Sequence, residues 1–198
     1  MAGAGKSTLR DMFKSGGAFV LNLDEVGHAF YSDADGKVYK LVLAKFADKV
    51  PGLLTGAGVI DRKKLGRHVF SDRVALDELN SIFYNEFNLY VKNLINETAG
   101  CGREFFVLDA AVLFDSGLNA LMDYNIWVSA AAGVLIQRLI AGRGIGADYA
   151  ERIIKTQLEA YKQYPAMADF IIDNGGGPEA LEAEYSRVIK EIRSNAKS

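Results

Sequence analysis

The first eight residues contain the pattern that most limits the folds open to this chain. Gly3-Ala-Gly-Lys-Ser-Thr8 matches the second half of a phosphate-binding loop, in which glycines let successive backbone N–H groups converge on phosphate oxygens. Lys6 would contact the β and γ phosphates, and Ser7 would offer its hydroxyl to Mg²⁺. The alternative is a flexible Gly- and Ala-rich N-terminus beside an ordinary helix start. The predicted phosphate-binding residues are Gly3, Ala4, Gly5, Lys6, Ser7 and Thr8.

This motif is incomplete at its amino end. The pattern G-x-x-x-x-G-K-[ST] places its first glycine before Met1, and the strand that leads into such a loop has no residues here. A buried central strand of about five apolar residues contributes on the order of 8–15 kcal/mol of burial. We therefore expect the native protein to carry an upstream strand that ends in glycine. In its absence, segments 105–109 and 124–129 are expected to leave a gap one strand wide, or to close up beside a distorted loop.

Composition and charge narrow the class of protein further. With 198 residues, of which 49% are hydrophobic, the chain can bury a substantial core. The net charge of −2 gives no basic field that would attract nucleic acid or an anionic membrane. Cys101 is the single cysteine, and there is no signal-peptide pattern and no apolar run of ~20 residues. We therefore expect a cytoplasmic protein without nucleic-acid or membrane partners.

Helical and strand patterns alternate in the order typical of an α/β protein. Apolar runs of strand length predict strands over 18–23, 105–109, 124–129 and 170–173. Apolar residues at helical spacing predict helices over about 6–15, 38–46, 76–94, 131–140, 147–163 and 178–192. The mostly helical stretch from about 31 to 100 is longer than a βαβ crossover requires and predicts an inserted subdomain for the second substrate. Most of its aromatic rings are expected to pack helix against helix.

Two predicted strands end in a carboxylate. Asp24 follows the strand over 18–23, and in parallel α/β sheets ligands bind at the carboxyl ends of the strands. Asp109 ends the next strand in the manner of a Walker B acid, which helps to organise Mg²⁺, although an Asp after a strand is also a common turn or N-cap residue. His28 and His68 lack Cys or His partners at ligand spacing, so structural roles are predicted for both.

Three arginines fall on a helix–turn–helix segment that follows the third predicted strand. Arg138, Arg143 and Arg152 would suit a mobile lid that neutralises charge on a transferring phosphoryl group and excludes water. Arg143 is the preferred candidate because glycines flank it at positions 142 and 144. The alternative is a solvated basic face, which we favour slightly for Arg138 taken alone.

The order of these motifs resembles that of the dephospho-coenzyme A kinases. The resemblance runs from Gly3 to about Glu184, and its carriers are the segments 3–8, 20–28, 60–70 and 168–174. It implies an α/β fold with a three-layer P-loop kinase core and a parallel sheet, arranged as a single domain over 1–198. A helical substrate-binding insertion over about 31–100 and a helical lid over about 138–163 would belong to that domain. It also implies that MgATP phosphorylates the ribose 3′-hydroxyl of dephospho-coenzyme A, with Asp24 as the base.

Several positions depart from the family pattern. Asn22 stands where these kinases usually have the first acid of a D-x-D stretch, and Tyr84-Asn85 stands where a His-Pro pair is common. Ala111 replaces a proline and Asp115 a glutamate in the segment that begins at Asp109. A diverged member of the family is the simplest account.

The sequence thus predicts an ATP-dependent kinase of a small molecule. Lys6 and Arg143 would stabilise the transferring phosphoryl group, Ser7 and Asp109 would hold Mg²⁺, and Asp24 would deprotonate the acceptor hydroxyl. The alternatives are a kinase of the same architecture with another nucleotide or metabolite acceptor, and an ATP-binding adaptor without turnover. The sequence does not fix the oligomeric state.

Overall fold

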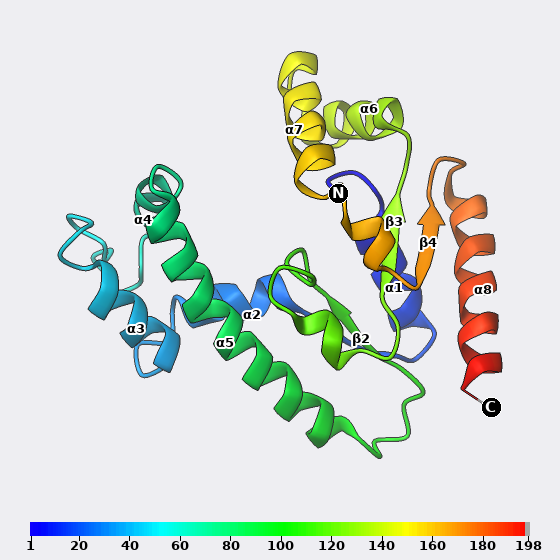
Figure 1. Ribbon diagram of the computed structural model, residues 1–198, viewed down its shortest axis with the longest axis horizontal. Coiled ribbons are helices and arrows are strands. Elements are labelled where there is room, and N and C mark those ends of the chain that lie inside the picture. The colour runs from blue at the N-terminus through cyan, green and yellow to red at the C-terminus, as the bar shows by residue number, and fades with distance from the viewer. Residues whose placement is uncertain (197–198) are drawn as a thin grey trace. The chain divides into compact units, whose positions relative to one another are not determined.

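The computed structural model describes residues 1–196, and the chain folds into two compact units (Figure 1). Unit 1 comprises Met1–Val20 and Asn119–Ser198, and unit 2 comprises Leu21–Leu118. Four helices of unit 1 are α1 (Lys6–Ser15), α6 (Ala132–Arg143), α7 (Ala147–Ala160) and α8 (Pro178–Asn195). It also holds the strands β3 (Ile126–Ser129) and β4 (Phe170–Asp173) and a short 3₁₀ turn over Tyr164–Met167, while a second 3₁₀ turn, Leu118–Leu121, begins at the last residue of unit 2.

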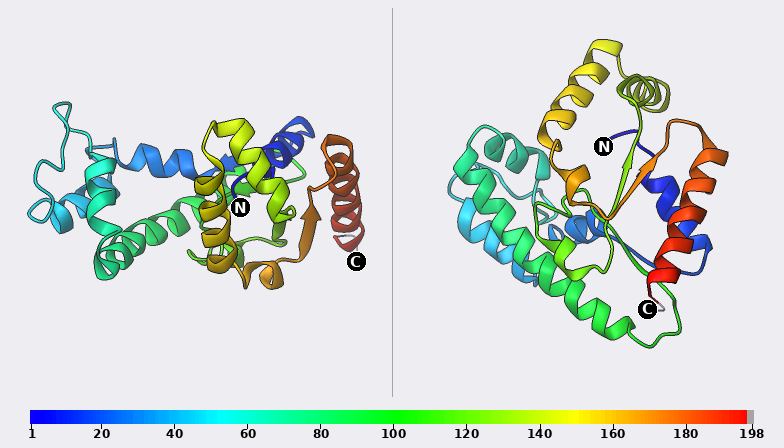
Figure 2. Two further views of the ribbon diagram at one scale, coloured as in Figure 1. Left: turned by 90° about the horizontal axis from the view of Figure 1, so that it is seen from above. Right: turned by 45° about the vertical axis from the view of Figure 1, so that its right-hand side comes forward.

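Unit 1 is built on a parallel pair of strands. β3 and β4 run parallel in register from Ile126 opposite Phe170 to Ser129 opposite Asp173. Alternate residues of β4 are buried, so that Phe170 and Ile172 face the core, and α8 lies alongside this strand (Figures 1 and 2). Helices α6 and α7 pack against each other as a hairpin. Gly144 ends α6 at φ 63°, a left-handed conformation that glycine adopts without steric cost.

Unit 2 is mostly helical. It contains the second half of β1 (Phe19–Asn22), then α2 (Leu23–Phe30), α3 (Lys37–Phe46), α4 (Arg62–Val69), α5 (Arg73–Thr98) and β2 (Phe106–Asp109). Asp61 caps α4 and Asp72 caps α5, each by accepting hydrogen bonds from two backbone N–H groups of the first turn. Both α3 and α4 pack on the 26-residue α5, and Phe46 of α3 is 0% exposed.

Several aromatic side chains of unit 2 pack helix against helix, as the sequence predicts for most of them. Phe30 stacks on Phe87 with ring centroids 5.6 Å apart, and Phe83 meets Phe87 edge-on, also at 5.6 Å. Tyr31 contacts Phe83 at 4.8 Å. His68 is half-buried with its ring 6.1 Å from that of Phe46. These rings contribute apolar burial to the core of the unit.

The described strands form two separate two-stranded sheets. β1 is the neighbour of β2 in one sheet, and β3 is the neighbour of β4 in the other. Within residues 1–196, no helix is both long and apolar enough to cross a lipid bilayer.

Candidate active site

The glycine loop in unit 1 lies directly before helix α1. Gly3 and Gly5 have φ values of 73° and 93°, in the left-handed region that residues with a Cβ atom rarely occupy. Gly5 is the N-cap of α1, and Lys6 is the first residue of that helix. Ser7 lies exposed on the first turn. Because the first N–H groups of a helix lack intrahelical acceptors, the loop and this turn offer donors to an anion.

Side chains from other elements of unit 1 hold this loop. Arg138 on α6 donates a hydrogen bond from Nη1 to the carbonyl of Gly3 over 3.3 Å. Asn174, which follows β4, donates from Nδ2 to the carbonyl of Ala4 over 2.8 Å. The sequence slightly favoured a solvated position for Arg138 on a basic helix face. In the structure Arg138 is half-buried and bonded to the loop, so that expectation is wrong. Neither contact was predicted.

Arg143 lies at the carboxyl end of α6. It is exposed and is the last residue of the helix, followed by the left-handed Gly144. Gly142 is part of the helix, so only the glycine on the carboxyl side forms the turn between α6 and α7. Arg152 on α7 lies with its guanidinium carbon 5.8 Å from the ring centroid of Tyr149. A catalytic role for Arg143 remains a prediction.

In unit 2 the predicted base lies on a helix rather than at the tip of a strand. β1 ends at Asn22, and Asp24 is an exposed residue of the first turn of α2. Asn22 caps that helix by accepting a hydrogen bond from the N–H of Asp24 at 3.1 Å, and it donates to Oε1 of Glu25 at 2.8 Å. A helix N-terminus stabilises negative charge, and Asp24 is placed there. Asn22, which departs from the family pattern, is therefore the N-cap of α2.

The second predicted acid ends the neighbouring strand. Asp109 is the last residue of β2 and is only 6% exposed. In residues 1–196 no group of three or more His, Cys, Asp or Glu side chains could hold a metal ion. Mg²⁺ is usually bound in kinases through substrate phosphates, water and one or two protein oxygens. The exposed hydroxyl of Ser7 and the carboxylate of Asp109 are oxygen ligands of the type that Mg²⁺ prefers.

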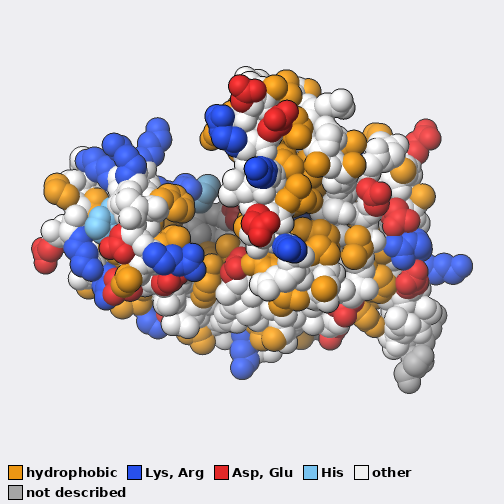
Figure 3. Space-filling model, turned by 45° about the horizontal axis from the view of Figure 1, so that its top comes forward, with side chains coloured by type: hydrophobic (Ala, Val, Ile, Leu, Met, Phe, Trp, Pro, Cys, Tyr) orange, Lys and Arg blue, Asp and Glu red, His pale blue; other side chains and the backbone are white. Residues whose placement is uncertain are grey.

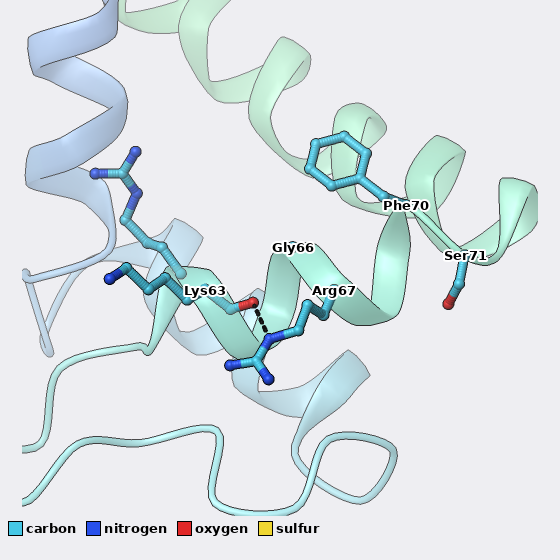
Figure 4. Close-up of a pocket in the computed structure, with 6 residues that line it drawn as sticks. Lys63, Gly66, Arg67, Phe70 and Ser71 are labelled. Carbon is cyan, nitrogen blue, oxygen red and sulfur yellow. Dashed lines mark hydrogen bonds between the residues drawn. The ribbon is translucent and has the colours of Figure 1, made fainter. Parts of the chain in front are cut away.

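A basic hollow on α4 was not assigned by sequence reasoning. The hollow has a volume of about 650 Å³ and is lined by Arg62, Lys63, Gly66, Arg67, Phe70 and Ser71 (Figure 4). Figure 3 shows Lys and Arg side chains gathered on the part of unit 2 that carries α3 and α4. The sequence signal that could have indicated this basic hollow is the run of cations in Asp61-Arg-Lys-Lys-Leu-Gly-Arg67.

Contacts within unit 2 orient two of the cations that line this hollow. Arg67 donates from Nε to the carbonyl of Lys63 at 3.4 Å, which places its guanidinium along the helix. The Arg62 guanidinium carbon lies 5.6 Å from the ring centroid of Tyr31, whose pKa burial raises to about 12. Backbone N–H groups, first that of Lys64, hold the pKa of Asp61 below its usual value. Phe70 is 80% exposed.

Comparisons with known proteins identify the family of this chain. A family model described as dephospho-CoA kinase matches residues 2–179. The dephospho-CoA kinase of Mesorhizobium japonicum is 35% identical over 191 residues, which cover 96% of this chain and 92% of that protein. The enzyme of that name from Aquifex aeolicus is 34% identical over 194 residues, or 96% and 93% of the two chains.

Solved structures show the same fold. TT1252 from Thermus thermophilus superposes with a TM-score of 0.70 at 25% identity, covering 96% of this chain and 93% of that one. A shikimate kinase from Bacteroides thetaiotaomicron superposes at 0.51 with 16% identity, covering 96% and 93%, and supports the fold alone. The predicted α/β kinase fold is confirmed. A loop with two left-handed glycines, carried in a sequence that the family model matches almost throughout, leads to one assignment: the chain belongs to the dephospho-CoA kinase family.

Proposed function

We propose that this protein transfers the γ-phosphoryl group of ATP to the ribose 3′-hydroxyl of dephospho-coenzyme A, the last step of coenzyme A biosynthesis. The observation that carries this proposal is the family match over residues 2–179, in a chain where Gly3 and Gly5 have left-handed backbones directly before helix α1. The net charge of −2 supports a small-molecule acceptor over nucleic acid. We place the reaction in the cytoplasm.

The proposed mechanism assigns a separate task to each predicted residue. The loop Gly3–Thr8 and Lys6 hold the phosphates, and Arg143 adds positive charge where the transferring group carries its negative charge. Asp24 accepts the proton of the acceptor hydroxyl as the new O–P bond forms and the bond to ADP breaks. Ser7 and Asp109 would hold Mg²⁺, which when bound neutralises charge on the β and γ phosphates.

We further propose that the chain works as one P-loop kinase domain over 1–198 with two specialised parts. The helical segment over about 31–100 would bind the acceptor. The segment over about 138–163, which contains the second half of α6 and all of α7, would act as the lid. The hollow on α4 supports the first assignment. Dephospho-coenzyme A carries a pyrophosphate that Arg62, Lys63 and Arg67 could contact, and the exposed ring of Phe70 offers an apolar surface beside them.

Mass spectrometry tests the reaction directly. We expect dephospho-coenzyme A incubated with the protein and MgATP to gain one phosphate, and an analogue that lacks the 3′-hydroxyl to gain none. Phosphate transfer to a different nucleotide or metabolite, with none to dephospho-coenzyme A, would support the other kinase. ATP binding by calorimetry without transfer to any acceptor would support the adaptor.

The α4 hollow gives a prediction about the acceptor alone. Replacing both Arg62 and Arg67 by alanine should raise the KM for dephospho-coenzyme A by about 10-fold or more, because charge-assisted contacts to phosphate are lost. The KM for ATP should change by no more than about twofold. Lys92→Ala, which removes an exposed cation from α5, is the matched control. Steady-state kinetics with each substrate varied in turn make this measurement, and a rise in the ATP KM alone would contradict it.

Arg143→Ala tests the lid. We expect kcat to fall by about 10-fold or more while the melting temperature stays unchanged, because an exposed residue at a helix end contributes little packing. Lys155→Ala removes a charge from the exposed face of α7 and should leave kcat unchanged. If Arg143→Ala instead unfolds the protein, the residue is structural.

A further inference from the structure

Side chains from elements much later in the sequence form hydrogen bonds with the phosphate-binding loop and the residue before it. All of these contacts lie within unit 1. The N–H of Ala2 donates to Oε1 of Gln157 on α7 over 2.8 Å. As described above, Arg138 holds the carbonyl of Gly3, and Asn174 holds the carbonyl of Ala4. Ala2 and the first two residues of the loop, Gly3 and Ala4, therefore have side-chain partners more than 130 positions away.

Asn174 is the most firmly fixed of these partners. Its residue is only 5% exposed, and its own N–H donates to the carbonyl of Ser129 over 2.7 Å, which continues the pairing of β3 with β4. The side-chain amide packs directly on Gly5, where a Cβ atom would lie 2.1 Å from Nδ2. Two independent features therefore require glycine at position 5: its φ of 93° and the close approach of Asn174.

This hydrogen bond also sets the direction of a backbone donor. The carbonyl of Ala4 and the N–H of Gly5 belong to one planar trans peptide, so they point in opposite directions. Holding the carbonyl against Asn174 therefore turns the Gly5 N–H away from Asn174. Ala4 is 0% exposed, so its carbonyl would lose this partner without an easy replacement by water if Asn174 were removed.

We infer that Asn174 is a positioning residue for the phosphates of ATP: it fixes the Ala4–Gly5 peptide in the orientation that presents its N–H to the ligand. The inference rests on the proposed function, in which this loop binds ATP. Asn174 acts through the loop and makes no contact with the nucleoside. Its contribution is therefore the same for any ligand that the loop holds by a chain of phosphates.

Calorimetry with two ligands tests this assignment. ATP and inorganic tripolyphosphate, which has no base or ribose, are titrated into the wild-type protein, Asn174→Ala and the nearly isosteric Asn174→Asp. We expect both ligands to bind each variant about 10-fold more weakly, because the peptide loses its support. Asn174→Asp should bind at least as weakly as Asn174→Ala, since its carboxylate has no N–H donor and faces a carbonyl oxygen.

Asn125→Ala is the matched control. Asn125 lies at the opposite end of β3 and also donates from Nδ2 to a backbone carbonyl, that of Asn119. Its replacement should leave both affinities within about twofold of wild type. Weaker binding of ATP with unchanged binding of tripolyphosphate would overturn the inference, because Asn174 would then act on the nucleoside. Unchanged affinity for both ligands would overturn it as well.

The remaining outcomes are also decisive. If neither Asn174 variant shows the wild-type circular dichroism and a cooperative melt, the residue serves the fold, and the positioning role is wrong. If the wild-type protein binds neither ATP nor tripolyphosphate, the proposed function fails, and this inference fails with it. Normal wild-type binding together with unaffected variants would reject the role of Asn174 alone and leave the kinase assignment standing.

Discussion

Lys6→Ala should lower kcat/KM for ATP by about 10²–10³-fold, the loss that follows when one preorganised charge is removed from a phosphoryl-transfer site. Lys6 is the first residue of α1 and directly follows the left-handed Gly5, so its ammonium would be directed at the β and γ phosphates. Little change in the unliganded melting temperature is expected, because the side chain would face ligand rather than core. Steady-state kinetics and thermal melts measure the two effects.

Lys14→Ala is the control for that experiment. Lys14 is an exposed cation in the last turn of the same helix, and its replacement changes the net charge equally. It should leave kcat/KM within about twofold of wild type. A large loss of ligand-free stability in Lys6→Ala, with ATP affinity retained, would show that Lys6 supports the fold and does not bind phosphate.

Asp24→Asn should lower kcat by about 10²-fold or more while ATP affinity is retained, since the change removes the proton acceptor and preserves the shape. The residue is exposed on the first turn of α2, where the side chain of Asn22 fixes its N–H. An amide at position 24 can still be accommodated there, so the fold should persist. Single-turnover transfer to dephospho-coenzyme A, alongside calorimetry with ATP, separates chemistry from binding.

Glu25→Gln provides a close comparison for Asp24→Asn. Both variants remove one negative charge from the first turn of α2, and both side chains are exposed. Glu25 accepts a hydrogen bond from Asn22, and glutamine can accept it too. We expect Glu25→Gln to retain transfer. Equal losses in the two variants would mean that the charge at the helix end matters and that Asp24 is not the base.

Local sequence signals predicted the elements that carry strong periodicity or a clear stop. The first helix begins at Lys6 and ends at Ser15, as expected from its apolar spacing and the following Gly16-Gly17. β4 spans Phe170–Asp173 as predicted. The dephospho-CoA kinase family could be identified because its motifs are short and local, and the comparisons confirm it.

Other features depend on contacts that a local pattern does not contain. The helix α2 was missed because Asp24-Glu25 after an apolar run suggested the tip of a strand, whereas Asn22 caps a helix at that point. The helix α4 has few apolar residues, and its charges hide its period, although Asp61 before the run was an available N-cap signal. The bond between Asn174 and Ala4 joins positions 170 residues apart and has no local signature.

The separation of Asn174 from the loop also matters during synthesis. Ribosomes add about 5–20 residues per second, so about 10–30 s pass between the addition of Ala4 and that of its partner 170 residues later. Closing so long a loop costs little more free energy than closing a shorter one, because the entropy grows only with the logarithm of length. The long separation therefore delays the contact during synthesis but adds little to its free-energy cost. For that interval the nascent chain carries its glycine loop without the amide that orients it, and we expect ATP to protect from proteolysis only those chains that extend past the last strand.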